Sequence, residues 1–130
     1  MKAIILARVS DKKQDSNSAQ VSRLLEFTKL KNFLNPQIYE LEESSTKATR
    51  KKFKEIIKGI EKSKESVALF TDTIDRLQRG FNESVMLDVL IKSGKLELHF
   101  YRENLVINKD SNSADIIRWD MGVMFARGYV

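Results

Sequence analysis

The stretch Lys2-Ala3-Ile4-Ile5-Leu6-Ala7-Arg8-Val9-Ser10 contains a short apolar run that is followed at once by a cation and a hydroxyl. A run of this length is typical of a buried strand. Ligands of open α/β sheets bind outside the carboxyl ends of the strands. We therefore interpret Arg8 and Ser10 as candidate site residues: a phosphate-binding cation beside a nucleophile.

Short apolar runs alternate with helical patterns along the rest of the chain. The patterns predict strands over residues 2–7, 36–41, 66–71, 95–101 and 105–107, and helices over residues 18–33, 50–63, 82–93 and from Ser113 or Asp115 to Phe125. The helix over 50–63 is the clearest, because its apolar residues Phe53, Ile56, Ile57 and Ile60 follow helical spacing. Such alternation predicts one α/β domain with a mostly parallel sheet.

Several local features make this prediction more specific. In the first helix, the pattern places Val21, Leu24, Leu25 and Thr28 on the buried face, with a cap at Ser16, Asn17 or Ser18. Residues 42–49 are polar and predict a loop, and Gly94 predicts the end of a helix. Alternation in 95–101 predicts a half-exposed strand with His99 on its polar side. The last helix is apolar nearly all round, so it needs cover from the core or from a partner chain.

Composition narrows the classes of function. The 130 residues, 42% hydrophobic and 32% charged, suit one soluble domain that can bury a core. The absence of cysteine excludes disulfides and thiolate metal sites and favours a cytoplasmic protein. No signal peptide is visible, and no apolar run approaches the ~20 residues that span a bilayer. The net charge of +5 favours a polyanionic partner such as nucleic acid.

A second group of candidate residues follows the third predicted strand. It is Asp75-Arg76-Leu77-Gln78-Arg79, and Arg50 opens the helix after the polar loop. Arginine is always charged, and its fork matches two phosphoryl oxygens. One serine and several arginines at strand ends therefore indicate chemistry on a phosphodiester.

Each of these residues also has an ordinary structural interpretation. Ser10 suits a turn, Arg50 suits an exposed first helical turn, and Arg76 or Arg79 could pair with Asp75 or Glu83. Two other functions compete with the phosphodiester hypothesis. One is a non-catalytic nucleic-acid-binding or regulatory domain. The other is a metal-dependent nuclease with Mg²⁺ on Asp72 and Asp75, although the only histidine, His99, sits in mid-strand and suits a surface or packing role better.

Taken together, the motifs resemble those of the serine recombinases, which are resolvases, invertases and large integrases. The matching blocks are Arg8-Val9-Ser10 with Gln14 and Ser18-Ala19-Gln20, then Arg50, then Asp75-Arg76-Leu77-Gln78-Arg79. The resemblance implies a resolvase-like three-layer α/β domain over residues 1–130, with a mostly parallel sheet of about four to five strands between helices. It also implies that the family's C-terminal dimerisation helix and DNA-binding region are absent, as in an excised or truncated catalytic domain.

The resemblance also implies roles for the site residues. Ser10 would attack the scissile phosphate and hold the DNA end as a 5′-phosphoserine. Arg8, Arg50, Arg76 and Arg79 would surround that phosphate. Asp75 would orient arginines or move a proton, and Gln14 and Gln20 would brace the Ser10 loop or contact DNA.

The family's properties extend to partners and cofactors. The partner would be double-stranded DNA, bound by a homodimer or tetramer in the full-length context, with no membrane, cofactor or metal. The isolated fragment is expected to bind DNA weakly and not to recombine it. Two positions depart from the family pattern: Lys51 stands where the family often has proline, and Thr46 stands where it often has glycine.

Overall fold

The computed structural model describes residues 1–9, 15–42, 47–77 and 81–126. Its strands are β1 (Lys2–Val9), β2 (Gln37–Glu42), β3 (Val67–Thr71), β4 (Leu96–Phe100) and β5 (Leu105–Ile107). Its helices are α1 (Asp15–Leu30), α2 (Lys47–Lys62), α3 (Ile74–Leu77), α4 (Phe81–Lys92) and α5 (Ser113–Ala126). The strands form one sheet in the order β2-β1-β3-β4-β5, in which only the β4–β5 pair is antiparallel. The predicted α/β class and mostly parallel sheet are confirmed.

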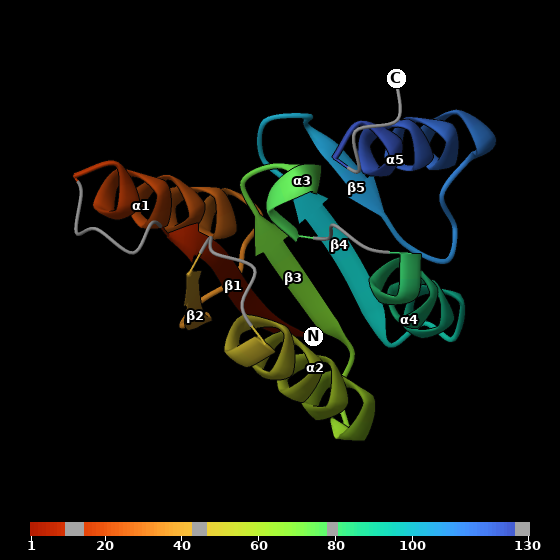
Figure 1. The fold of residues 1–130 in the computed structure, drawn as a ribbon, viewed down its shortest axis with the longest axis horizontal. Coiled ribbons are helices and arrows are strands. Elements are labelled where there is room, and N and C mark those ends of the chain that lie inside the picture. Colours follow the sequence, from red (N-terminus) through yellow and green to blue (C-terminus); the bar gives the residue numbers. More distant parts are fainter. Residues whose placement is uncertain (10–14, 43–46, 78–80, 127–130) are drawn as a thin grey trace.

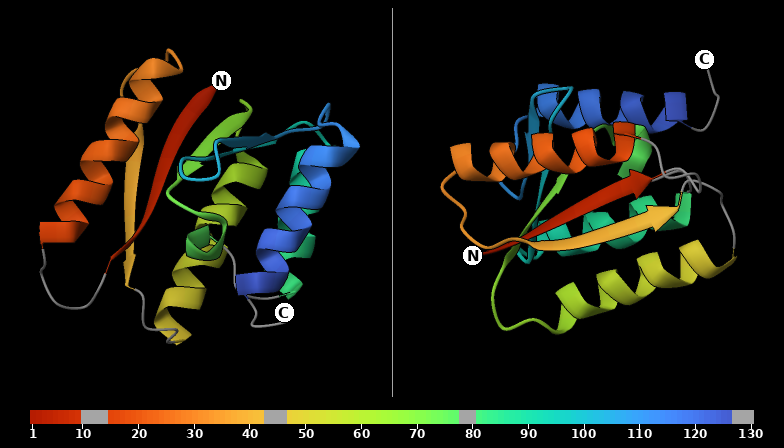
Figure 2. Two further views of the ribbon diagram at one scale, coloured as in Figure 1. Left: turned by 90° about the horizontal axis from the view of Figure 1, so that it is seen from above. Right: turned by 90° about the vertical axis from the view of Figure 1, so that its left-hand side faces the viewer.

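The sheet separates helices into two outer layers (Figure 1 and Figure 2). Helix α1 alone covers one face, whereas α2, α4 and α5 cover the other. The central strand β1 explains this arrangement, since its alternate residues are apolar on both sides. Ile5 points to the α1 face and packs with Leu24 and Phe27, while Leu6 points to the opposite face and joins the larger core.

The first two helices begin earlier than the sequence indicates. Helix α1 starts at Asp15, so Ser16, Asn17 and Ser18 lie within the helix and the predicted cap is wrong. Its buried face includes Phe27, whereas Leu25 is 36% exposed, because helical rotation places Phe27 over the sheet. Helix α2 starts at Lys47, so the end of the predicted loop over 42–49 is helical and its start, Glu42, ends β2.

Strand β4 is buried on both faces, so the predicted half-exposed strand is wrong. His99 is only 3% exposed and stacks on Phe70, with 4.4 Å between ring centroids. Phe27 and Phe33 pack edge-on against the same imidazole. Burial lowers the pKa of His99, an effect that the nearby Glu97 carboxylate opposes and Lys31 reinforces. The prediction from alternating polarity was wrong because α1 places a second apolar layer over this face of the sheet.

The remaining elements follow the predictions more closely. Helix α4 ends before Gly94, whose φ of 81° is the left-handed conformation that favours glycine. The edge strand β5 is confirmed. Helix α5 begins after Asn112, whose Oδ1 accepts the Asp115 backbone N–H at 2.8 Å. No helix among the described residues is long and apolar enough to cross a bilayer.

The domain covers only one side of α5. Trp119 and Val123 are buried in the core beside β5, so the core supplies part of the cover that was predicted for this helix. The apolar residues on the other side remain exposed; they are Ile117, Met121, Met124 and Phe125.

Candidate functional site

The carboxyl ends of β1 and β3 lie next to each other, because the two strands are adjacent and parallel. Arg8 comes near the end of β1, and the short helix α3 follows β3 after two residues. The Arg8 side chain is 4% exposed, and its Nη2 donates a long hydrogen bond of 3.5 Å to the Leu77 carbonyl. The first and third motifs of the sequence therefore meet at one sheet edge.

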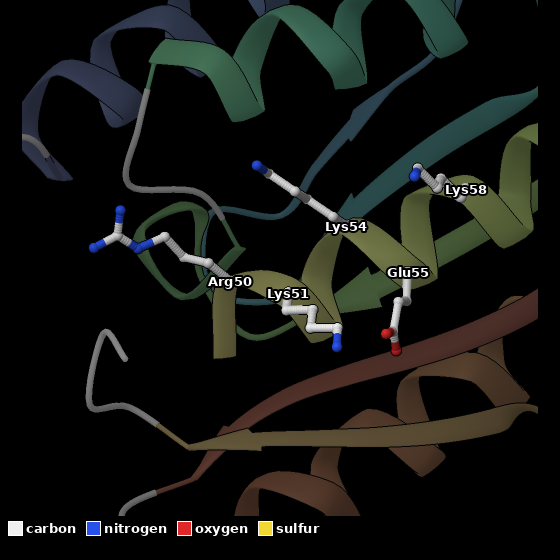
Figure 3. A pocket seen from close by; sticks show the side chains of 5 residues that line it. All are labelled: Arg50, Lys51, Lys54, Glu55 and Lys58. Atoms are coloured by element: carbon white, nitrogen blue, oxygen red, sulfur yellow. The ribbon is translucent and has the colours of Figure 1, made fainter. Parts of the chain in front are cut away.

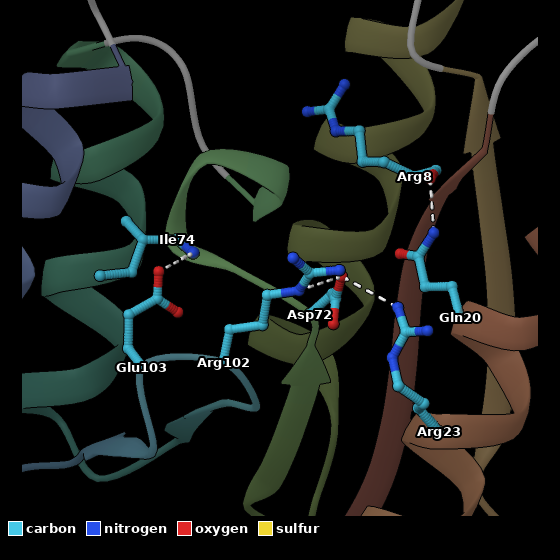
Figure 4. Close-up of polar contacts among 7 residues, drawn as sticks. All are labelled: Arg8, Gln20, Arg23, Asp72, Ile74, Arg102 and Glu103. Atoms are coloured by element: carbon cyan, nitrogen blue, oxygen red, sulfur yellow. Dashed lines mark hydrogen bonds and ion pairs between the residues drawn. The ribbon is translucent and has the colours of Figure 1, made fainter. Parts of the chain in front are cut away.

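Gln20 secures the end of β1 from the α1 side. Its Nε2 donates a hydrogen bond of 2.8 Å to the Arg8 carbonyl, and the side chain is buried (Figure 4). A buried amide–carbonyl bond fixes backbone position, since an unpaired buried carbonyl would be unfavourable. The last described residues before Ser10 are thus held by both the β2 ladder and α1.

Arg50 is the fourth residue of α2, not the first as predicted, and it is exposed. It lines a surface hollow of about 440 Å³ together with Lys51, Lys54, Glu55 and Lys58. Figure 3 shows Arg50, Lys54 and Lys58 extending from the same side of the helix. None of these cations forms an ion pair with the part of the chain that the structure describes. We call Arg50, Lys54 and Lys58 the basic face of α2.

Several predicted site residues fall in segments that the structure does not describe. Ser10, Gln14 and Arg79 lie outside the described residues. The backbone of Asp75 and Arg76 forms part of α3, next to the Leu77 carbonyl that Arg8 contacts. The structure therefore brings together Arg8, Gln20 and the α3 backbone, with Arg50 on a separate helix.

A charge cluster around a buried carboxylate at the end of β3 was not predicted from the sequence. The Asp72 carboxylate is 4% exposed, and its Oδ2 lies 3.3 Å from Nη2 of Arg23 on α1. The same oxygen lies 3.3 Å from Nε of Arg102, which follows β4 (Figure 4). Arg23 and Arg102 are separated from Asp72 by 49 and 30 positions in the sequence (72 − 23 and 102 − 72), so no local spacing connects the three.

Comparisons with known proteins decide the family. The sequence model of the family "Resolvase, N terminal domain" matches residues 3–126. The chain belongs to this resolvase family. Among solved structures, the chain is similar to the N-terminal catalytic domain of TP901-1 integrase, with a TM-score of 0.68 and 17% identity. The similarity covers 96% of this chain and 93% of that chain, and it confirms the three-layer fold. A comparison with curated proteins gives no match.

The resolvase-family chain is the catalytic domain of a site-specific recombinase. In this recombinase domain, Asp72 lies between two arginines, which disfavours the Mg²⁺ position considered for it, because cations repel one another. Within the described ranges, no group of three or more metal-ligating side chains occurs. His99 stacks on Phe70 in the core. This is the packing role that was considered as the alternative to a metal ligand.

Proposed function

We propose that this recombinase domain cleaves and rejoins double-stranded DNA through a covalent phosphoserine at Ser10. The Ser10 Oγ forms a bond to the scissile phosphorus, and the bond from phosphorus to the 3′-oxygen breaks. The Ser10 proton is lost, and the leaving 3′-oxygen takes up a proton to become a hydroxyl. The phosphodiester is exchanged for another, so rejoining is the same reaction reversed and needs no nucleotide cofactor.

The observation that carries this proposal is the contact between Arg8 and the α3 backbone. It joins the strand end that precedes Ser10 to the helix that carries Asp75 and Arg76. Attack on a phosphodiester concentrates negative charge on the phosphoryl oxygens, and preorganised cations stabilise that charge most where water is excluded. In the proposal, Arg8, Arg76 and Arg79 surround the phosphate, and Asp75 orients them or transfers the proton.

Two further contacts support the assignment. The Gln20 bond to the Arg8 carbonyl supports a bracing role for Gln20 at the strand end that precedes Ser10, and Gln14 is proposed to support Ser10 or to contact DNA. The basic face of α2 supports a polyanionic substrate, because its cations have no carboxylate partners among the described residues. Arg50 belongs to this face and is proposed to reach the same phosphate.

We propose that residues 1–130 act as one catalytic domain, in the cytoplasm, and that paired or tetrameric copies bring two DNA sites together. Integration, inversion and resolution all use the same strand chemistry. A non-catalytic domain of the same fold is the alternative, and it differs in making no covalent adduct with DNA.

The test is a covalent adduct between protein and DNA. The chain would be joined to a DNA-binding module that recruits it to a known duplex, and the adduct would be mapped by mass spectrometry. We expect an adduct at Ser10 that survives EDTA, and no adduct with Ser10→Ala. Arg76→Lys should reduce its rate by about 10²-fold or more, since a point charge replaces the bidentate fork.

Two outcomes would contradict the proposal. Cleavage that EDTA abolishes and Ser10→Ala retains would indicate a metal-dependent nuclease. DNA binding with no adduct at any residue would favour the non-catalytic alternative. Lys29→Gln, on an exposed part of α1, is the matched control and should leave the adduct unchanged.

A further inference from the structure

The segment between β4 and β5 reaches across to the loop that leads into α3. Beyond the last paired residues of β3 and β4, the Tyr101 N–H donates to the Thr71 carbonyl at 3.0 Å. The Arg102 N–H then donates to the Asp72 carbonyl at 2.9 Å. These two bonds extend the pairing of β3 and β4 past the strand ends, so residues 71 and 72 are held from the β4 side.

Glu103 makes the next contact along this segment. Its Oε2 accepts the backbone N–H of Ile74, the first residue of α3, at 3.3 Å (Figure 4). The first N–H groups of a helix have no intrahelical acceptor, and a carboxylate is a favourable partner for them. The other oxygen, Oε1, is buried and has no hydrogen-bond partner among the described residues. Glu103 therefore fixes the start of the helix that carries Asp75 and Arg76.

Asp72 adds side-chain contacts to the same segment. Its buried carboxylate lies against Arg102 from the β4–β5 segment and against Arg23 from α1. A buried carboxylate is tolerated when cations compensate its charge, so moving Asp72 would separate it from both partners. Asp72 thus links α1, the end of β3 and the β4–β5 segment three residues before Asp75.

Helix α5 restrains α3 from its other side. A Cβ at Gly122 would lie 2.4 Å from Cδ1 of Ile74, so glycine permits a close approach of the two helices. Arg118 of the same helix donates from Nη2 to the Glu103 carbonyl at 2.6 Å. The α3 backbone is therefore held by Glu103 and by α5 together.

We propose that Asp72 and Glu103 are positioning residues for DNA cleavage: they set the place of α3, and through it the place of Asp75 and Arg76 at the phosphate. This proposal rests on the proposed function. Neither residue touches the reacting atoms. Misplacement of a catalytic group by about 1 Å can reduce a rate by about 10²-fold, so loss of either contact should act on the chemical step.

The test separates this role from a general contribution to stability. Glu103→Ala removes the acceptor for Ile74, whereas Glu103→Gln keeps an oxygen acceptor at the same length. The rate of Ser10 adduct formation would be measured under single-turnover conditions with saturating protein. The temperature would be kept below the thermal unfolding midpoint of every variant. We expect Glu103→Ala to slow the reaction by about 10- to 100-fold, with unchanged DNA affinity. Glu103→Gln should restore the rate to within about threefold of the original chain.

Asp72→Asn is the second variant, because it keeps the side-chain shape and loses the charge. It should slow adduct formation by about tenfold without weakening DNA binding. Asp88→Asn is the matched control: Asp88 pairs with Lys92 on the surface of α4, far from these contacts in the sequence, and should leave the rate unchanged.

The outcomes are distinguishable. If the original chain forms no Ser10 adduct, the proposed function fails, and this inference fails with it. If the original chain reacts and both Glu103→Ala and Asp72→Asn react at the same rate, only the positioning role is overturned. A loss of DNA affinity in proportion to the loss of rate, or no recovery in Glu103→Gln, would also overturn it. If Glu103→Ala does not fold, Asp72→Asn and Glu103→Gln decide the question.

Discussion

Two regions of this domain are rich in cations, and they use them in opposite ways. At the end of β3, Arg23 and Arg102 share the buried carboxylate of Asp72. On the basic face of α2, Arg50 and its lysine neighbours are exposed and have no carboxylate partner among the described residues. The first arrangement holds three segments together, whereas the second leaves positive charge available to a phosphate. A count of positive residues in the sequence does not separate these roles.

Removal of both cations around the buried Asp72 carboxylate should have the largest effect on stability. The double substitution Arg23→Ala with Arg102→Ala removes both compensating charges and should reduce the free energy of unfolding by about 2–3 kcal/mol, less than for a fully buried pair because the Arg102 side chain is 62% exposed. Urea unfolding followed by the fluorescence of Trp119, the single tryptophan and a buried one, measures this change. Addition of Asp72→Asn to the double variant should recover part of the loss. A triple variant no more stable than the double one would show that the buried charge is not the cause.

A pair of glycine substitutions compares packing next to these two regions, at the contact between α5 and α3 and on α2. Gly122→Ala places a Cβ against Ile74 and should lower the free energy of unfolding by up to about 2 kcal/mol, because overpacking of about 1–3 kcal/mol exceeds the helix preference of alanine. Gly59→Ala on α2 meets no atom within 4 Å and should raise it by about 0.5–1 kcal/mol, because alanine favours the helix. Thermal unfolding of the two variants compares them directly. Equal effects would mean that α5 does not approach α3 as closely as the structure describes.

Neutralisation of the basic face should have the smallest effect on stability and a visible one on DNA binding. Lys54→Gln with Lys58→Gln should change the free energy of unfolding by less than about 0.5 kcal/mol. The logarithm of affinity for a random duplex falls linearly with the logarithm of salt concentration, by ~0.9 for each phosphate neutralised. The double variant should therefore reduce this slope by about two. The control is Lys29→Gln with Lys64→Gln, which loses the same charge and should leave the slope nearly unchanged. If both double variants have the same slope, DNA does not bind at the basic face of α2.

The sequence predicted the fold because its signals are local. The apolar run before Arg8 and the spacing of Phe53, Ile56, Ile57 and Ile60 are each complete within a few residues, and the structure confirms the elements that they indicate. The burial of a strand face by a helix that is distant in the sequence leaves no signal in the strand itself. His99 was placed on an exposed face because its polarity alternates with Leu98, yet Phe27 and Phe33 from the α1 region bury it.

The candidate site divides in the same way. The motifs around Arg8, Arg50 and Asp75-Arg76 are short and contiguous, so their spacing alone identified the candidate residues and the family that they resemble. Only the tertiary structure brought Arg8 to the Leu77 carbonyl, Gln20 to the Arg8 carbonyl and Glu103 to the start of α3. Sheet topology explains this difference. Parallel β1 and β3 are adjacent although α1, β2 and α2 separate them in the chain, and the contacts at their ends are made by side chains that sequence spacing does not relate.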